Sequence, residues 1–464
     1  MFKPQQHHLQ IERLILQNGG IAKRLDDGFY EQKLVHANND LNNLGGTIDA
    51  SNSLIASAGH DLNVISSTST QSNATSSRTN ISRVAGLYVT GDQGLLVASA
   101  GNDLHLDAAQ IINNGKDSST KLRAGHDLSI GTVASGQQSQ ITSNSKNKLS
   151  ENSTQDHGST IQTAGDISLQ AGQDLNIKAA TINSSQGSIN VTAARNLTIA
   201  TGQSTANSVG NTSYGYGTTN STATATTQAI SSLGAANNIN LQSGADTHLT
   251  SVNLNAGKAI DIAATGNLTI DAVKDSSQLD YAYNAKNKRD IIHNQDETVI
   301  GSNINAGNNI SLTATQAASV SAIPTTGGNI TLNSVNITSQ TGAVMLNADQ
   351  DVTIGSTTES HSSYAEYYSR SKSLLSSKSH LTIIWERFID RETGEVIFSF
   401  SMLTVNADGH PIMQHFHKPE DEKRSIIVLN EANYQPWLQA NHVQARSLLK
   451  VAPNNFLISE AAPR

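Results

Sequence analysis

Histidine is the residue type of this sequence best suited to chemistry, because the 464-residue chain has 15 His and no Cys. Three of them, His410, His415 and His417, lie close together near the carboxyl end. A metal site would need three or four converging ligands, and a general acid or base would need a reacting group to serve. We therefore expect these histidines to surround a surface turn, with no metal and no cofactor bound. His417 stays the one candidate for a proton-transfer role.

Several other kinds of chemistry are excluded by composition. Without Cys there is no thiol nucleophile, no disulfide framework and no zinc site built on thiolates. No nucleophile-elbow pattern, P-loop or dinucleotide fingerprint is present. With 30 Lys+Arg against 38 Asp+Glu, the net charge is -8, which disfavours nucleic-acid binding. His60, His105 and His126 lie in or beside a repeated motif, and we expect them to face solvent.

The elements that must position these residues are built from small side chains. Charged residues make up 15% of the chain, below the usual level of about 25%. All Phe and both Trp lie outside residues 40–354. An ordinary globular core needs large side chains to fill it. This stretch must therefore have a thin interior or be disordered, as polar low-complexity chains often are.

A repeated motif favours the ordered alternative. It consists of a small pair, two polar residues and an apolar-polar-apolar triplet, with copies beginning at Ala58, Ala100, Ala124, Ala171, Ala193 and Ala306. The first apolar position falls at 62, 104, 128, 175, 197, 239, 260, 310, 330 and 352, mostly about 20–24 residues apart or about twice that. We predict an all-β fold, a right-handed parallel β-helix (β-solenoid) of about 15 coils of about 21 residues each.

The alternation along a strand predicts which side chains are buried. The expected interior residues are Val64, Leu104, Ile130, Ile177 and Leu312, and the expected outward residues are Asn63, His105, Ser129, Asn176 and Ser311. We expect the motif glycine to supply a positive φ at the corner, and the following Asp or Asn to bond its own backbone. Loops are predicted for the segments without triplets, at 66–82, 135–160, 201–230 and 273–300, the last with a solvated basic run, Lys286–Arg289.

The repeats of residues 37–356 resemble the haemagglutinin repeats of filamentous haemagglutinins and of the related contact-dependent inhibition exoproteins of the two-partner secretion pathway. Leu25–Val35 is similar to a segment that precedes the repeats in those proteins. The resemblance implies an adhesive protein at the surface of a Gram-negative bacterium, with receptors on host or neighbouring cells as partners. No signal peptide, secretion domain or apolar span is recognised, so we expect an internal fragment or a rearranged gene, with a cytoplasmic location as the alternative.

The tail, residues 380–464, has a different composition. Strands are predicted at 382–387 and 398–405 around a turn at 390–395, then a strand at 426–429 and a helix at 431–438. This order resembles the carboxy-terminal part of the SOS-response-associated peptidase family, which senses abasic sites in single-stranded DNA. That family acts through an amino-terminal Cys, which this chain lacks. His417 is the one matching site residue, so the resemblance implies a truncated α+β piece without activity.

The sequence therefore predicts four parts: a remnant segment at 1–36, the β-solenoid at 37–356, a Ser/Tyr-rich linker at 357–379 and the truncated piece at 380–464. The predicted function is structural and adhesive, without catalysis. Two alternatives stay open. One is an abasic-site DNA-binding enzyme, argued from the tail alone, and the other is a non-functional chimera of two unrelated genes.

Overall fold

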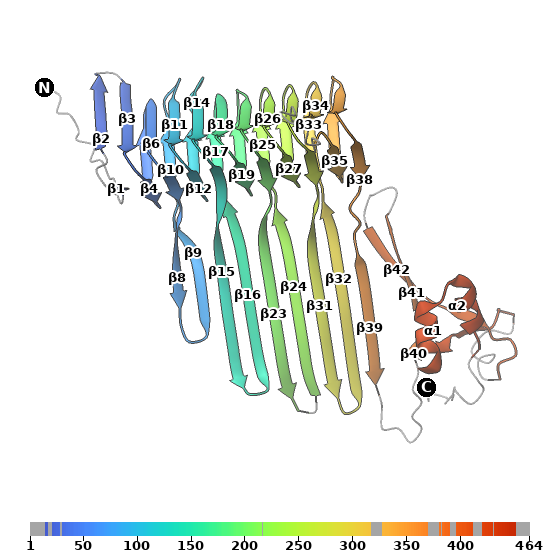
Figure 1. The fold of residues 1–464 in the computed structure, drawn as a ribbon. Coiled ribbons are helices and arrows are strands. Elements are labelled where there is room, and N and C mark those ends of the chain that lie inside the picture. Colours follow the sequence, from blue (N-terminus) through green and yellow to red (C-terminus); the bar gives the residue numbers. More distant parts are fainter. Residues whose placement is uncertain are drawn as a thin grey trace, which may run out of the picture. The chain divides into compact units, whose positions relative to one another are not determined.

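Pairing between successive copies of the repeat produces a parallel β-solenoid (Figure 1). The computed structural model describes residues 14–16, 21–27, 30–215, 217–316, 327–369, 380–381, 383–389, 396–411, 420–429 and 431–451. The chain divides into two compact units, Met1–Tyr367 and Tyr368–Arg464.

Each coil of the solenoid contributes one strand to each of three parallel sheets. The first sheet contains β3 (Tyr30–Ala37), β6 (Ser53–Ala58), β11 (Leu95–Ala100), β14 (Ser119–Ala124), β18 (Asp166–Ala171), β21 (Ile189–Ala193), β26 (Ile239–Ser243), β29 (Ile260–Ala264), β34 (Ile310–Ala314) and β37 (Val344–Ala348). The second contains β4 (Leu41–Leu44), β7 (Leu62–Ile65), β12 (Leu104–Asp107), the start of β15 (Leu128–Asn144), β19 (Leu175–Lys178), β22 (Leu197–Ala200), β27 (Thr247–Thr250), β30 (Leu268–Asp271), β35 (Ile330–Asn333) and β38 (Val352–Gly355).

The third sheet contains β5 (Thr47–Ala50), β10 (Gly86–Val89), β13 (Gln110–Asn113), β17 (Thr160–Thr163), β20 (Thr181–Ser184), β25 (Ser232–Ala235), β28 (Asn253–Ala256), β33 (Ser302–Ala306) and β36 (Val335–Ser339). At the amino-terminal end, β2 (Ile21–Asp27) pairs with β3, and β1 (Leu14–Leu16) pairs with β4, both antiparallel.

The predicted inside–outside register is confirmed. Val64, Leu104, Ile130 and Leu312 are 0% exposed and Ile177 is 1% exposed, whereas the five outward residues all contact solvent. The apolar side chains of the buried column are Leu, Ile, Val and Ala, and a few Ser, Thr and Asn side chains are buried beside them. Like residues stack on like, because the register pairs Leu104 with the leucines of the coils on either side. A column this narrow is filled by aliphatic side chains, so it needs no Phe or Trp.

The number of coils differs from the prediction. The third sheet has nine strands and the first has eleven, which gives about ten coils rather than about 15. Part of the error lies in the triplet positions, because those at 239, 260 and 310 belong to the first sheet and the others to the second. The larger part of the error comes from the four segments without triplets, whose residues were counted as coils.

Those four segments are β-hairpins, so the prediction of loops is wrong. The hairpins are β8 (Ser67–Ser72) with β9 (Ser76–Arg83), the rest of β15 with β16 (Asn147–Gly158), β23 (Gly202–Tyr214) with β24 (Gly217–Ala229), and β31 (Val273–Ala285) with β32 (Lys288–Ile300). Only Lys286 and Asn287 of the basic run form a turn, while the rest of it lies in β32.

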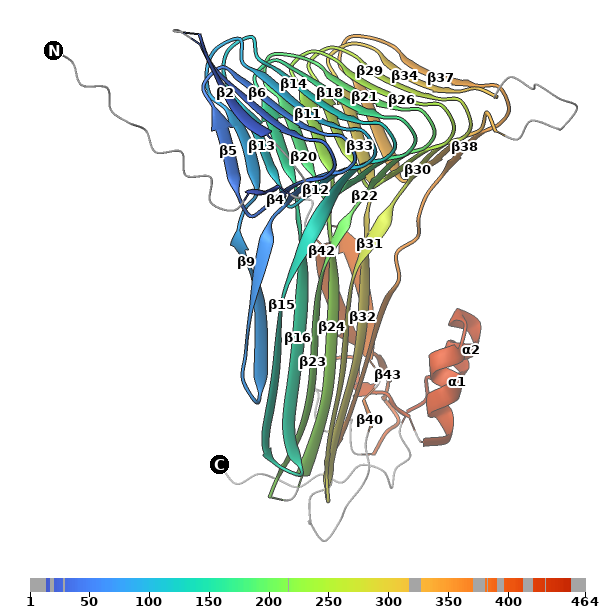
Figure 2. The same ribbon diagram turned by 60° about the vertical axis from the view of Figure 1, so that its left-hand side comes forward.

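Neighbouring hairpins pair with one another. The pairs β9–β15, β16–β23 and β24–β31 are antiparallel, and β39 (His361–Ser369) pairs with β32. The result is one antiparallel sheet, the hairpin sheet, that projects from one side of the solenoid (Figure 2). In β15 a single strand serves both structures, because Leu128–Ile130 pairs in the solenoid and Thr132–Asn144 pairs in the hairpin sheet.

A hairpin follows the second-sheet strand in every other coil. The chain enters the hairpin sheet after β7, β15, β22, β30 and β38, and it turns directly into the third sheet after the other strands of the second sheet. Each direct turn contains one residue with positive φ: Gly45, Ala108, Ala179, Ser251 or Ser334, with φ between 46° and 67°. The spacing explains the alternation. A hairpin is two strands wide, about 9.6 Å, and two coils occupy the same length along the axis.

The corners between the first and second sheets differ from the prediction in two ways. Gly59, Gly101, Gly125, Gly172 and Gly307 are not among the residues with positive φ. They are required by close approach, because a Cβ on Gly59 or Gly101 would lie 2.0 Å or 2.1 Å from a main-chain oxygen of the preceding coil. The Asp or Asn that follows does not bond its own backbone either. Its Oδ1 accepts a hydrogen bond from the N–H of the equivalent residue one coil later, as from Asp61 to Asp40 at 3.1 Å.

These corner contacts form a continuous column, hereafter the Asx column. Its members are Asp40, Asp61, Asp103, Asp127, Asp174, Asn196, Asp246, Asn267, Asn329 and Asp351. The N–O distances range from 2.7 Å to 3.3 Å. Because each side chain bonds the next coil, the column connects the coils at this corner in addition to the sheets.

The second unit is a small α+β piece. The predicted hairpin strands are present as β41 (Ile383–Ile389) and β42 (Val396–Met402), while their turn lies outside the described residues. β43 (Thr404–Asn406) pairs with β44 (Arg424–Ile426), and β40 (His380–Leu381) pairs with β45 (Val428–Leu429). The predicted helix is η2 (Glu431–Asn433) followed by α1 (Tyr434–Gln439). A further helix, α2 (His442–Leu448), starts at a capping box formed by Asn441 and Gln444.

Two predicted boundaries fall inside strands. The boundary at 36/37 lies within β3, which pairs along its length with β6 of the solenoid. The segment predicted as a linker, 357–379, contains β39, and the boundary between the two units falls near the end of that strand.

Candidate functional site

The histidine group of the tail is only partly described. His415 and His417 lie outside the described residues. His410 is 4% exposed, and its backbone N–H donates to the carbonyl oxygen of Ala407 at 3.0 Å. His410 is therefore not the surface histidine that the sequence predicted. The role of His417 stays a prediction.

The repeat histidines lie at the surface, as predicted, but two of them contact carboxylates. His60 Nδ1 lies 3.1 Å from Asp40 Oδ1 and 3.1 Å from Asp61 Oδ2. His126 Nδ1 lies 3.1 Å from Asp103 Oδ1 and 3.3 Å from Asp127 Oδ2. In each cluster, one carboxylate comes from the preceding coil of the Asx column. Sequence reasoning missed both clusters because that partner lies 20 or 23 residues away, at a variable separation.

Two carboxylates of the Asx column, Asp61 and Asp174, have a lowered pKa. Burial raises the pKa of Asp61, but hydrogen bonds from the Asn102 side chain and the Asp103 N–H outweigh burial and lower it. The hydrogen bond from Arg195 is the largest cause that lowers the pKa of Asp174. Arg195 Nε lies 2.7 Å from Asp174 Oδ1. The column therefore holds negative charge at neutral pH and attracts cationic side chains.

The hairpin sheet is a single layer with solvent on both faces. Its strands carry mainly Ser, Thr, Asn and Gln, and Ile291 is its one buried large apolar residue among those described. Side-chain pairs across the strands support the sheet, such as Thr154 with Thr205 at 2.6 Å between their hydroxyl oxygens. His293 stacks on Tyr364 with ring centroids 5.9 Å apart, and its Nδ1 lies 2.7 Å from Asp280 Oδ1.

One face of the hairpin sheet carries two apolar groups, one on β15 and β16 and the other on β31 and β32, with Gly210 and Ser221 between them. Directly opposed positions place a row on this face, in the order Ile141, Leu149, Gly210, Ser221, Tyr281 and Ile292. Leu279 lies two residues from Tyr281 and therefore shares the face. Ile141 is 57% exposed and Leu279 is 37% exposed. Exposed apolar side chains that share one face are typical of contact surfaces.

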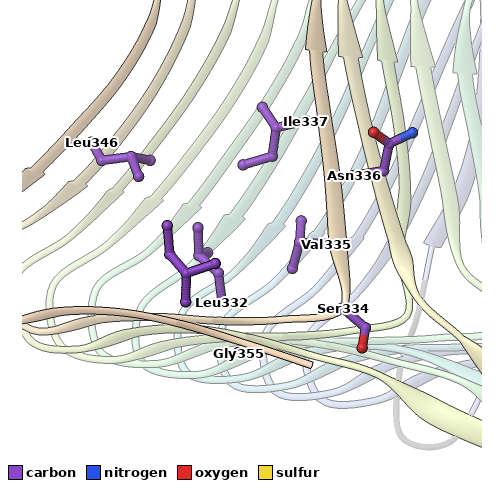
Figure 3. Close-up of a pocket in the computed structure, with 8 residues that line it drawn as sticks. Leu332, Ser334, Val335, Asn336, Ile337, Leu346 and Gly355 are labelled. Atoms are coloured by element: carbon purple, nitrogen blue, oxygen red, sulfur yellow. The ribbon is translucent and has the colours of Figure 1, made fainter. Parts of the chain in front are cut away.

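The carboxyl-terminal end of the solenoid is open. A hollow of about 560 Å³ is lined by Leu332, Ser334, Val335, Asn336, Ile337, Leu346, Ile354 and Gly355 (Figure 3). It is the apolar column seen from its end, because β36 and β37 are the last strands of their sheets in the described part of the chain. Ile354 is consequently 71% exposed. The hollow has no convergent charged groups, so its lining offers no chemistry beyond apolar contact.

Comparison with known proteins gives one match. A family model described as hemagglutinin repeat matches residues 83–215, 206–290 and 281–379, which together span more than half of the chain. The matched span contains the three longer hairpins, from β15 to β32, and the strand β39, and it ends before the tail. The resemblance of the tail to SOS-response-associated peptidases is therefore not supported. Searches of curated proteins and of solved structures find no match.

Proposed function

The chain belongs to the hemagglutinin repeat family, and from this we propose that it is a structural and adhesive protein whose contact surface is the hairpin sheet. The observation that carries the proposal is the pair of apolar groups on one face of that sheet. A single layer without a core has no packing reason to keep Ile141 and Leu279 on one face. A surface that meets another molecule does have such a reason.

The arrangement of the hairpins supports weak, repeated contact. The solenoid holds successive hairpins side by side at a spacing of about 9.6 Å. A ligand that repeats, such as a cell surface or a matrix fibre, can then meet several hairpins at once. Linked weak contacts give an avidity far above that of each contact alone. The exposed Ser, Thr, Asn and Gln side chains add hydrogen-bonding groups over the rest of the sheet.

The cellular setting is part of the proposal. Proteins built from these repeats act outside the cell, so we assign this chain to the surface of a Gram-negative bacterium, reached by the two-partner secretion route. Among the described residues, no helix is long and apolar enough to cross a membrane. Receptors on host cells, or on neighbouring bacteria as in contact-dependent inhibition, are the partners that fit an adhesive sheet.

The proposal is tested by cell retention on surfaces coated with the full chain. Ile141→Ser combined with Leu279→Ser should reduce the number of retained erythrocytes or epithelial cells several-fold. Met345→Ser is the matched control, because Met345 is 58% exposed but lies on the solenoid in β37. Unchanged retention by the double variant, with unchanged circular dichroism, would remove the hairpin sheet as the contact surface. An equal loss of cell retention in Met345→Ser would also remove the hairpin sheet as the contact surface.

A further inference from the structure

The two histidine–carboxylate clusters occupy equivalent corners of the solenoid. Backbone N–H to carbonyl bonds run from His60 to Asn39, from Asn102 to His60 and from His126 to Asn102. The same series continues through Gln173 to Arg195. These residues therefore hold one position in successive coils, directly before the Asx column. His occurs there twice, and each time two Asp side chains face its Nδ1.

We propose that each cluster binds one divalent transition-metal ion of the Zn²⁺ type. The ligands are His60 Nδ1 with one oxygen each of Asp40 and Asp61, and His126 Nδ1 with one oxygen each of Asp103 and Asp127. In each cluster the three donor atoms lie within 4.8 Å of one another. Imidazole nitrogen and carboxylate oxygen are both regular zinc ligands, and three protein ligands with one water complete a tetrahedral site.

The distances match the geometry that such an ion requires. Tetrahedral coordination with bonds of 2.0–2.1 Å separates neighbouring ligand atoms by about 3.3 Å. The four nitrogen–oxygen separations are 3.1, 3.1, 3.1 and 3.3 Å. The side chains of His60 and His126 are 56% and 42% exposed, so an ion reaches them from solvent without opening the fold.

The charge at these corners also favours a cation. Each cluster places two carboxylates beside one imidazole nitrogen. A later coil shows how the same position is filled when no His is present. There Arg195 places its guanidinium on Asp174. In the coil between the two clusters, Asn102 donates to Asp61 Oδ1 at 2.9 Å instead.

Metal binding at these corners would join adjacent coils. Asp40 belongs to one coil, whereas His60 and Asp61 belong to the next, and the second cluster repeats this arrangement. An ion that binds only the stacked coils stabilises them against unfolding. The bound state should therefore unfold at a higher temperature than the chelator-treated protein.

The test is zinc titration of the full chain after chelator treatment, with metal content and thermal unfolding as the two readouts. His60→Asn combined with His126→Asn is the variant, because Asn102 shows that the position accepts Asn. The matched control is His248→Asn, since among the described residues His248 contacts one carboxylate, Asp271, at 3.1 Å.

The wild type and the control should bind two more zinc ions per chain than the double variant, and each single variant should lose one. The zinc-dependent rise in unfolding temperature should be smaller in the double variant. Equal zinc content in the wild type and the double variant would overturn the proposal. A loss of the same size in His248→Asn would also overturn it, because it would show that any surface histidine contributes. Neither readout depends on adhesion.

Discussion

At the scale of single residues, the Asp and Asn side chains of the Asx column form hydrogen bonds between coils, where the sequence predicted bonds within a local turn. The motif places Asp or Asn directly before each strand of the second sheet, and the sequence predicted a bond to the residue's own backbone. The side chain instead reaches the N–H one coil away. The predicted local bond and the observed bond to the next coil would each satisfy a backbone N–H. The observed bond also connects two coils.

The pKa of Asp174 gives this column a measurable pH dependence. The pKa is lowered from 3.8 in the folded state, first by the hydrogen bond from Arg195. A carboxyl whose folded pKa is depressed adds stability that is complete above its unfolded pKa and is lost as the pH falls through the folded value. Asp174→Asn should therefore lower the unfolding temperature at pH 7, and the difference from the wild type should shrink as the pH falls through the lowered folded pKa of Asp174.

Arg195→Gln supplies the control for this prediction. In that background Asp174→Asn should have a smaller effect at pH 7, because the two residues interact directly. Thermal unfolding by circular dichroism at several pH values measures both differences. An effect of Asp174→Asn that stays constant as the pH falls into the acid range, or that does not depend on Arg195, would contradict this account.

Single residues also show what the sequence could reveal. The alternation that placed Leu104 inside and Asn176 outside is a local property of each strand, so it was predicted correctly. The role of Gly59 was not predicted correctly, because the atom that leaves no room for a Cβ there is a carbonyl oxygen of the preceding coil. The cluster around His60 was missed for the same reason. Its Asp40 ligand belongs to another coil, and hairpins make the separation between coils irregular.

At the scale of elements, the alternation of direct turns and hairpins is the main organising feature. After each strand of the second sheet, the chain either turns through one left-handed residue or enters the hairpin sheet. Four of the five left-handed residues are Ala or Ser rather than Gly. A residue with a Cβ costs about 1–2 kcal/mol in this conformation.

This strain makes Ala179 a specific test. Ala179 has φ 50°, so Ala179→Gly relieves the strain while it increases the entropy of the unfolded chain by about 0.5–1 kcal/mol. The expected change in the free energy of unfolding ranges from none to a gain of about 1 kcal/mol. Ala180→Gly is the control. Ala180 is 0% exposed and its φ is not positive, so that change should cost about 1–2 kcal/mol.

Chemical denaturation of both variants measures the two free energies. The critical result is which of the two variants has the larger free energy of unfolding. If Ala179→Gly destabilises the protein as much as Ala180→Gly does, the left-handed turns carry no strain and the account of the direct turns is wrong.

The hairpins could not be recognised from hydrophobic alternation, because both of their faces meet solvent. One face of β24 carries Thr, Asn and Gln and the other carries Gly, Ser, Thr and Ala, so neither face has a large apolar side chain. The available indications were the high β-propensity of Thr and the length of each segment. Each of the longer segments is long enough for two strands of 12 or 13 residues around a short turn. A disordered segment has no reason to keep such matched halves.

At the scale of the whole repeat unit, the solenoid and the hairpin sheet stabilise each other. A single-layer sheet without a core is marginal alone. Here every hairpin continues from a coil whose position is fixed by a buried aliphatic column. Because two coils match the width of one hairpin, the pairing continues from β8 to β39. The sequence predicted the solenoid, whose period is in the motif, but not the sheet, whose register depends on that match.

The central claim is that separate hairpins pair into one sheet, and a designed disulfide tests it most directly. The natural chain has no Cys, so two introduced cysteines have no other partner. Asn152 of β16 and Asn207 of β23 are exposed and directly opposed, although they belong to different hairpins. Opposed positions in an antiparallel pair have the Cα separation that a disulfide requires.

Asn152→Cys combined with Asn207→Cys should therefore oxidise to an intramolecular disulfide, seen as a reducible change in mobility and as a linked peptide by mass spectrometry. Asn152→Cys combined with Ser208→Cys is the control, because neighbouring residues of a strand point to opposite faces. The account predicts efficient linkage in the first pair and little in the second. No linkage in the first pair, or equal linkage in both, would contradict it.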